Sequence, residues 1–304
     1  MSLNNTIRLN KVLRELNISL DKAIEFFSEL GYEIEAKPTT KIDLYLYELL
    51  KIKLKYIAPI KPVFLNENLI TTTSIINKVR EKNGVPRSVY KYYSLTEYNF
   101  ESIKDKYLYF AKPTDFNDPF DCYNNLISFV NQNSKNKTRH KTKEKKFAEK
   151  LKNIGICCFS RTKDSILMWS HYASKHQGFC IEYKANQNVD GINPLDINYV
   201  SKFKKAQYFE KAERAIFHLL FTKSNDWKYE KELRIPLTNI ETNKERKVNF
   251  RDNDIISIYF GVNCEQSTKD RLTNLITENY SSEIVFYNGK MSNNEFNIKW
   301  EKIN

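Results

Sequence analysis

One short run near residue 230 has side chains that suit acid–base chemistry. In WKYEKELRI, which begins at residue 227, Glu230 and Glu232 are two apart and Arg234 follows. If the run is a strand, these three side chains share one face. Leu233 and Ile235 then point the other way, into a core. Two close carboxylates separate their pKa values and can serve acid–base or cation-stabilising roles. The alternative is a solvent-exposed strand face with an ion pair.

A second candidate is the loop KPTDFNDPFD, residues 112–121, which interleaves acids, an amide, two phenylalanines and two prolines. Proline fixes its own φ and holds the preceding residue in extended geometry, so Pro119 keeps Asp118 in a stiff turn. Asn and Asp bond their own backbone in such turns. The loop is therefore either a structural turn or a rigid element that presents Asn117, Asp118 or Asp121 to a ligand.

A third candidate is MWSHYA, residues 168–173, followed by HQGF. Trp169, His171 and Tyr172 fall on one short predicted helix and belong either to the core or to a pocket wall. His171 is one position away from the face that Met168 and Tyr172 share. We therefore expect His171 to turn toward a cleft.

Several other chemistries lack their motifs. The chain has no HExxH, CxxC, GxSxG, GxGxxG or P-loop pattern. His171 and His176 are five apart, a poor spacing for two metal ligands on one helix face. Cys157 and Cys158 lie in an apolar strand-like run, where cysteine is usually a small buried hydrophobe. We expect no metal site and no catalytic cysteine.

The charge is concentrated in one segment. Residues 131–152 hold nine Lys or Arg and two Glu, a net charge of +7 within a chain of net charge +12. Runs of like charge repel each other and remain solvated, which favours a flexible basic insertion. The alternative is a contact with nucleic acid or another polyanion through Lys141, Lys143, Lys145 and Lys146.

Composition indicates a folded protein in a reducing compartment. The 304 residues include 19 Tyr, 19 Phe and 3 Trp but only 7 Gly and 8 Pro, which excludes disordered and collagen-like chains. No apolar run approaches the ~20 residues that span a bilayer, and the N-terminus lacks a signal-peptide pattern. Five cysteines without framework spacing indicate free thiols. We expect a cytoplasmic protein with no membrane association.

Hydrophobic patterns predict an α+β fold. Strand-like runs such as VYKYYSL, YLYFAKP, IGICCFS, GFCIEYK and ELRIPL alternate with helical runs after a helical N-terminal segment. This order predicts a mixed or antiparallel sheet packed with helices. We expect three parts: a small all-helical module at 1–56, a linker at 57–87 and an α+β domain at 88–304.

The N-terminal part has three helical patterns. RLNKVLRELN repeats apolar residues at helical spacing, Ser19 can cap a second helix that ends near Gly31, and a third begins at Thr40 or Asp43. Residues 8–42 resemble the short N-terminal module of bacterial translation initiation factor two. Such modules are attached to unrelated proteins, so the resemblance implies docking to a partner through residues 1–56 and no chemistry.

The larger part carries a different resemblance. YKYYSL, LYFAKPTDFNDPFDC, CFSRTKDSILMWSHYASKHQGFCIEY and WKYEKELRI together resemble the bacterial family of unknown function DUF2971, over about residues 88–240. The combination of FNDPFD, MWSHYA and the YEKE run is specific. The family name implies no activity.

The same residues are more distantly similar to ADP-ribosyltransferases. Those enzymes place His or Arg on a first strand and end with a strand that carries a catalytic Glu, often as Glu-x-Glu. Lys91 stands where His or Arg is expected, and YEKE supplies the Glu-x-Glu. The resemblance implies catalysis by Glu232 with Glu230, and no metal. It implies NAD contacts from Lys91, Tyr92, Tyr109, Asn117, Asp118, Trp169, His171, Tyr172 and Arg234, with Tyr92 and Tyr109 stacked about the nicotinamide.

Two hypotheses follow. The first is an NAD-consuming ADP-ribosyltransferase-like effector, such as a toxin or a component of antiviral defence. The second is a non-catalytic nucleic-acid-binding or adaptor protein that uses the basic insertion and the N-terminal module. They differ in whether Glu230, Glu232, Lys91 and the 112–121 loop meet in one cleft.

Overall fold

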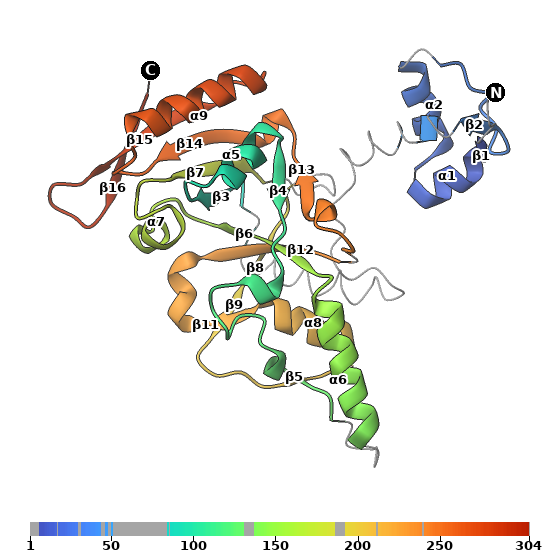
Figure 1. The fold of residues 1–304 in the computed structure, drawn as a ribbon, viewed down its shortest axis with the longest axis horizontal. Helices are drawn as coiled ribbons and strands as arrows, with labels where there is room; N and C mark the ends of the chain where they lie inside the picture. The colour runs from blue at the N-terminus through green and yellow to red at the C-terminus, as the bar shows by residue number, and fades with distance from the viewer. Residues whose placement is uncertain are drawn as a thin grey trace. The chain divides into compact units, whose positions relative to one another are not determined.

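The computed structural model describes residues 6–16, 18–29, 32–43, 46–47, 50, 84, 86–130, 137–185, 192–210, 212–238 and 240–303. The chain divides into two compact units, Met1–Ala58 and Pro59–Asn304. Figure 1 shows both ribbons. The linker predicted at 57–87 lies almost wholly outside the described residues, so it stays a prediction.

The first unit combines helices with a small sheet. Helices α1 (Leu9–Leu16) and α2 (Leu20–Glu29) accompany strands β1 (Thr6–Arg8) and β2 (Lys41–Asp43), which pair antiparallel. As predicted, Ser19 caps α2 by accepting the N–H of Lys22 at 3.3 Å. The prediction of an all-helical module is wrong. Ile42 is the one apolar residue between two charged neighbours, a strand pattern, and its buried side chain joins the core of this unit.

The second unit is built on an eight-stranded sheet. Its spatial order is β16 (Ile298–Lys302), β15 (Val285–Met291), β14 (Ile255–Phe260), β7 (Phe179–Lys184), β3 (Ser88–Tyr93), β6 (Gly155–Ser160), β12 (Glu232–Leu237) and β8 (Leu195–Asp196). Neighbours are antiparallel except β14 and β15, which run parallel. The fold is α+β, with a mixed, largely antiparallel sheet.

Helices pack against this sheet and enclose its cores. They are α5 (Glu97–Lys104), α6 (Lys137–Leu151), α7 (Ile166–Tyr172), α8 (Ala212–Phe221) and α9 (Gln266–Asn279). One face buries Val89, Phe179, Leu233 and Phe260 with residues of α5 and α9. On the other face, α7 and α8 contribute to two further clusters. Leu233 and Ile235 are buried in the first core, as their alternation predicts.

Shorter elements complete the unit. Three two-stranded ladders pair β4 (Tyr107–Tyr109) with β13 (Lys247–Asn249), β5 (Ile127–Ser128) with β10 (Ala206–Gln207), and β9 (Asn198–Val200) with β11 (Thr222–Ser224). Five 3₁₀ turns lie among the described residues: η1 (Pro113–Asp115), η2 (Asn124–Leu126), η3 (Asn225–Glu230), η4 (Lys244–Arg246) and η5 (Asp252–Asp254).

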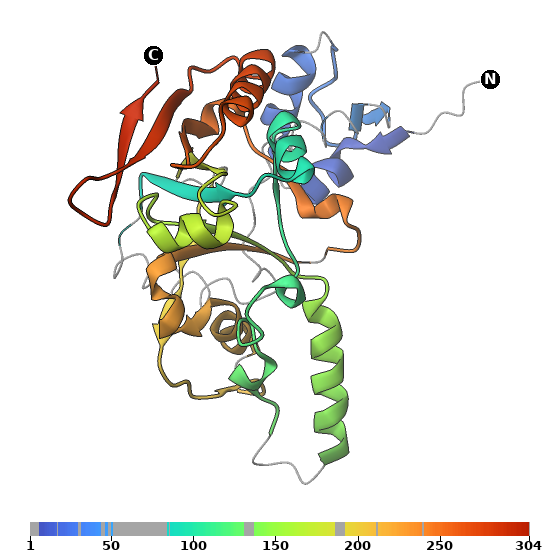
Figure 2. The same ribbon diagram turned by 60° about the vertical axis from the view of Figure 1, so that its left-hand side comes forward.

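The basic segment forms a helix rather than a loop. Within the predicted insertion at 131–152, the structure describes residues 137–152, and Lys137–Leu151 are the single helix α6. Phe147 and Leu151 are four apart, so they fall on one side of the helix, where both are buried. Phe147 packs against Phe129 and Tyr208. This apolar anchor explains why the run folds despite its charge. Figure 2 shows α6 as one straight helix.

The sheet divides between β3 and β6. These strands share a single pair, Tyr90 opposite Ser160. Toward its N-terminal end, β6 pairs instead with Ala111, whose backbone exchanges hydrogen bonds of 3.0 and 2.8 Å with Ile156. The later residues of β3 therefore separate from β6. We call this opening the fork.

All five cysteines are free thiols. In the part of the chain that the structure describes, no helix has the length and apolar character needed to cross a membrane.

Candidate functional site

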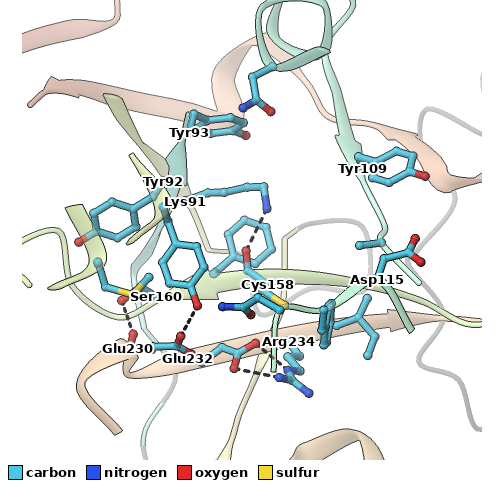
Figure 3. A pocket seen from close by; sticks show the side chains of 18 of the residues that line it. Lys91, Tyr92, Tyr93, Tyr109, Asp115, Cys158, Ser160, Glu230, Glu232 and Arg234 are labelled. Atoms are coloured by element: carbon cyan, nitrogen blue, oxygen red, sulfur yellow. Dashed lines mark hydrogen bonds and ion pairs between the residues drawn. The ribbon is translucent and has the colours of Figure 1, made fainter. Parts of the chain in front are cut away.

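A cavity of about 940 Å³ lies at the fork. Residues from β3, β6 and β12, the loop around η1, α7 and the β11–η3 segment form its walls. Figure 3 shows Lys91 near its centre, Tyr93 and Tyr109 on one side, and Glu230, Glu232 and Arg234 on the other. The volume is at the upper end of the range for small-molecule sites.

Three carboxylates and two cations form one wall. Nζ of Lys223 lies 2.5 Å from Oε2 of Glu230 and 3.0 Å from Oε2 of Glu232. It also lies 3.4 Å from Oδ2 of Asp121. Arg234 donates from Nε to Oε1 of Glu232 at 2.6 Å and from Nη2 to Oδ2 of Asp121 at 2.5 Å. All five side chains are buried. We call these five residues the carboxylate cluster.

A backbone turn brings Glu230 to this cluster. Glu230 is the last residue of η3, Lys231 follows with a left-handed φ of 44°, and Glu232 begins β12. The prediction that Glu230 shares a strand face with Glu232 and Arg234 is wrong, because the chain turns at Lys231 before the strand starts. The alternative prediction was a solvent-exposed strand face with an ion pair. Its exposure is wrong, because Glu232 and Arg234 are buried, but the ion pair is present. The two glutamates meet because Lys223 reaches both from β11.

The two glutamates have opposite pKa shifts. Burial opposes ionisation of Glu232, but Arg234 and Lys223 outweigh it and lower the pKa of Glu232 to about 2. Burial is also the largest influence on Glu230, and its pKa is raised despite the attraction of Lys223. Glu232 is therefore a fixed anion, whereas Glu230 binds a proton more readily. The hydroxyl of Tyr172 donates to Oε1 of Glu230 at 2.6 Å.

The cluster contains one carboxylate more than it contains cations. Oδ1 of Asp121 is buried and has no hydrogen-bond partner among the described residues. A buried polar atom without a partner costs free energy. A ligand group that donates hydrogen bonds or carries positive charge therefore suits this wall. In the described ranges no group of His, Cys, Asp or Glu is arranged to hold a metal ion. The ammonium and guanidinium groups lie between the carboxylates instead.

Lys91 occupies the fork itself. Its Nζ donates to the carbonyl oxygen of Cys158 at 3.2 Å, from β3 across to β6. It also lies 5.9 and 5.7 Å from the ring centroids of Tyr93 and Phe159. Among the described residues, Lys91 forms no ion pair with a carboxylate. The cavity therefore holds a positive charge next to the anionic wall.

Most of the sequence-predicted site residues line this one cavity. They are Glu230, Glu232, Lys91, Tyr92, Tyr109, Asn117, His171, Tyr172 and Arg234. Of the residues predicted to contact NAD, two do not line it. Trp169 is fully buried, and its Nε1 donates to the carbonyl of Lys163 at 2.7 Å. Asp118 is buried in the loop, where its Oδ1 accepts the N–H of Phe120 at 2.9 Å.

Tyr92 and Tyr109 do not face each other. The ring of Tyr92 packs edge-on against Trp169, and its hydroxyl donates to the carbonyl of Thr162 at 2.9 Å. Tyr109, on β4, lies on the other side of Lys91 (Figure 3). The predicted stacking of these two rings about one nicotinamide is therefore wrong.

Lys223 is the main site residue that the sequence analysis missed. It lies two residues after the apolar helix α8, so the pattern assigns it to a helix end rather than to a site. The sequence does contain one signal for it: a single lysine stands after the run AIFHLLF and a few residues before two glutamates. Asp121 was one of three alternatives in its loop, and the structure places this one in the cluster.

Comparisons with known proteins give two separate similarities. The family model described as "Protein of unknown function (DUF2971)" matches residues 168–235, which hold most of α7, all of β7 and the Glu230–Arg234 run. This supports the resemblance of the larger unit to that family. No solved structure matches the chain significantly.

The second similarity is to translation initiation factor IF-2. The chain is 64% identical over 45 residues to IF-2 of Christiangramia forsetii, which covers 15% of this chain and 5% of that protein. It is 51% identical over 45 residues to IF-2 of Flavobacterium psychrophilum, with the same coverage. With IF-2 of Phocaeicola vulgatus the identity is 32% over 101 residues, 33% of this chain and 9% of that protein. The chain therefore spans less than a tenth of these relatives.

Proposed function

We propose that the second unit cleaves the nicotinamide–ribose bond of NAD and transfers ADP-ribose to an acceptor. The observation that carries the proposal is the pair of adjacent carboxylates, Glu230 and Glu232, whose pKa values shift in opposite directions on the wall of a large cavity. A pair with separated pKa values can divide acid–base and electrostatic roles between its members. The family resemblance adds no activity of its own.

The proposed reaction balances without a metal or a redox partner. The bond between the nicotinamide nitrogen and C1′ of the ribose breaks, and its electron pair leaves with neutral nicotinamide. Positive charge develops at C1′ as an oxocarbenium-like centre. A nucleophile on the acceptor attacks C1′ and loses its proton. The products are nicotinamide, the ADP-ribosyl acceptor and one proton.

The contacts favour separate roles for the two glutamates. Glu232 is held as an anion by a two-point contact with Arg234, so it stabilises the developing positive charge as a preorganised group. Glu230 has the raised pKa that suits a general base, and we assign it the proton from the acceptor. Tyr172 holds Glu230 through its hydroxyl. The excess negative charge of the cluster favours binding of the positively charged pyridinium ring of NAD.

The test is incubation of the purified protein with NAD labelled in its adenylate part, together with cell RNA, DNA and protein in separate reactions. The proposal predicts label covalently attached to one acceptor class and an equal amount of free nicotinamide. Free ADP-ribose in every reaction would indicate hydrolysis with water as the acceptor. Intact NAD in all of them would contradict the proposal.

The 112–121 loop offers a matched pair of substitutions. Asn117 lines the cavity, whereas Asp118 bonds the backbone of its own turn. We expect Asn117→Ala to lower NAD consumption with little change in melting temperature. We expect Asp118→Ala to lower the free energy of unfolding by about 1 kcal/mol, the scale of one lost hydrogen bond. Thermal unfolding and NAD consumption measured on both variants check this. The reverse assignment of the two effects would contradict it.

Helix α6 supports nucleic-acid binding as a second candidate function. Its residues 137–151 include seven Lys or Arg against two Glu. Lys145 and Lys146 are exposed, and the structure gives no description of the Lys141 and Lys143 side chains. A helix with this charge suits a phosphate backbone and makes no base-specific contact by itself. Such a surface would serve a binding protein, or an enzyme whose acceptor is nucleic acid.

Neutralising the helix tests this candidate. We expect replacement of Lys141, Lys143, Lys145 and Lys146 by Gln to weaken retention on nucleic acid and to reduce its salt dependence. Each lost phosphate contact lowers the slope of log K against log salt by about 0.9. Binding measured from low to moderate salt gives that slope. An unchanged slope would leave α6 as a solvated helix.

For the first unit we propose docking to a macromolecular partner. The similarity to part of IF-2 supports this, because in this chain that part accompanies a second unit that matches a different family model. The two-stranded ladder and helices of this unit enclose a core of their own. Deletion of the unit is expected to leave NAD consumption by the second unit intact.

A further inference from the structure

The cavity has a second chemical environment beyond the fork. On the side away from the carboxylate cluster it is lined by Tyr93, Tyr98, Asn99, Ser102, Tyr107 and Tyr109. We call these six residues the aromatic compartment. They come from β3, α5 and β4, none of which contributes to the carboxylate cluster.

Two of its rings are open to an incoming ligand. Tyr98 is 79% exposed and Tyr109 is 42% exposed, on α5 and β4 respectively. Exposed aromatic rings on separate elements at the edge of a cavity form a surface on which a planar heterocycle stacks. The side chains of the carboxylate cluster are charged and buried and offer no ring of their own, and the rings beside them in the cavity include those of His171 and Tyr172.

The compartment also has a hydrogen-bonding group fixed in position. Nδ2 of Asn99 donates to the carbonyl oxygen of Ser94 at 2.8 Å and to its hydroxyl at 3.2 Å. Both bonds use the amide nitrogen, so the amide oxygen is available to accept from the edge of a base. An aromatic surface with a fixed polar group suits the binding of a purine better than the binding of a sugar or a lipid.

The junction between the two environments is cationic. Lys91 spans the fork and forms no ion pair among the described residues. Figure 3 shows it between the tyrosines above and the glutamates below. A ligand that passes through the fork therefore meets an aromatic compartment, then an ammonium group, then an anionic wall. This order requires a ligand with a planar base, an anionic middle and a cationic or hydroxyl-rich end.

We propose that the aromatic compartment binds the adenine of a dinucleotide that lies through the fork, with its pyrophosphate at Lys91. The inference rests on the proposed function for the identity of the other half, which lies at the carboxylate cluster. It assigns Tyr109 to the base rather than to the nicotinamide. It also accounts for a cavity whose lining includes residues of both α5 and α7, which pack into different core clusters.

The test measures binding of the two halves separately, by calorimetry with AMP and with nicotinamide mononucleotide. We expect Tyr109→Ala to weaken AMP binding about tenfold, the scale of one lost base–aromatic stack, and to leave nicotinamide mononucleotide unchanged. Lys91→Met is expected to weaken both, since each half carries a phosphate. The control is Tyr123→Ala, which removes a similarly exposed tyrosine outside the cavity.

The outcomes separate this inference from the proposed function. If the protein consumes NAD but Tyr109→Ala binds AMP as tightly as the parent, the placement of adenine is overturned and the proposed function stands. If AMP binds in a Tyr109-dependent way but NAD is not cleaved, the placement stands and the proposed function fails. Absence of AMP binding to the parent protein overturns the placement.

Discussion

Glu230→Gln is expected to lower the rate of NAD cleavage and transfer by about 10²–10⁴, the scale of losing a general base. The substitution keeps the shape of the side chain: the amide oxygen still accepts from Lys223, while the amide nitrogen donates to the Tyr172 hydroxyl, which reverses that hydrogen bond. It removes the group that accepts the proton. Because the cluster has one carboxylate more than cations, loss of this charge leaves the buried groups balanced, and we expect the protein to remain folded. Steady-state rates and thermal unfolding measure both effects.

A matched substitution controls for the loss of charge. Glu97→Gln removes a carboxylate on α5 that pairs with Arg271 at the surface. We expect it to leave both rate and stability close to those of the parent. For Glu230 we also expect the rate of the parent to fall as pH decreases through the raised pKa of this group. A Glu230→Gln enzyme with the parent rate and pH profile would contradict the assigned role.

Arg234→Met is expected to destabilise the second unit by about 3–5 kcal/mol, the scale of breaking a buried ion pair from one side. Arg234 is the most buried member of the cluster and bonds Glu232 twice and Asp121 once. Its removal leaves the three buried carboxylates with Lys223 as the one remaining cation of the cluster. Denaturant unfolding measures the loss. Arg271→Met, which breaks an exposed pair, is the control and should cost about 1 kcal/mol or less.

The ion pair between Arg234 and Glu232 makes the stability of the protein depend on pH. The pKa of Glu232 is lowered in the folded state from about 4.5 to about 2. A lowered pKa stabilises the fold at pH values above the unfolded-state pKa, and this contribution disappears as pH falls from about 4.5 toward 2. We expect the free energy of unfolding of the parent to decline across this window. A decline of the same size in Glu232→Gln would show that other groups cause it.

The sequence patterns predicted those parts of the fold that depend on residues close together in the chain. The alternation at Leu233 and Ile235 predicted their burial, and the spacing of apolar residues predicted α2 with its Ser19 cap. The run at 131–152 was expected to be solvated because its charges dominate the composition. Two apolar residues four apart were enough to anchor it as α6.

The site depends on contacts between distant segments, which no single run of sequence contains. Lys223 and Asp121 meet the glutamates because β11 and the loop after η1 pack against the same end of β12. The fork forms because β6 pairs with β3 at one end and with Ala111 at the other. Tertiary packing, rather than the local sequence, determines this change of partner. The left-handed Lys231 has no glycine to mark it, so the turn before β12 is invisible in the sequence. The Glu-x-Glu pattern nevertheless picked out two residues that lie together on one wall of the cavity.

The release of nicotinamide from NAD, followed for the parent protein and for Glu230→Gln at equal concentrations, tests the central claim most directly. The account predicts steady release by the parent and a rate at least about a hundredfold lower for the variant, with identical melting temperatures. No release by the folded parent, or equal release by both proteins, would contradict the claim that this cavity cleaves NAD.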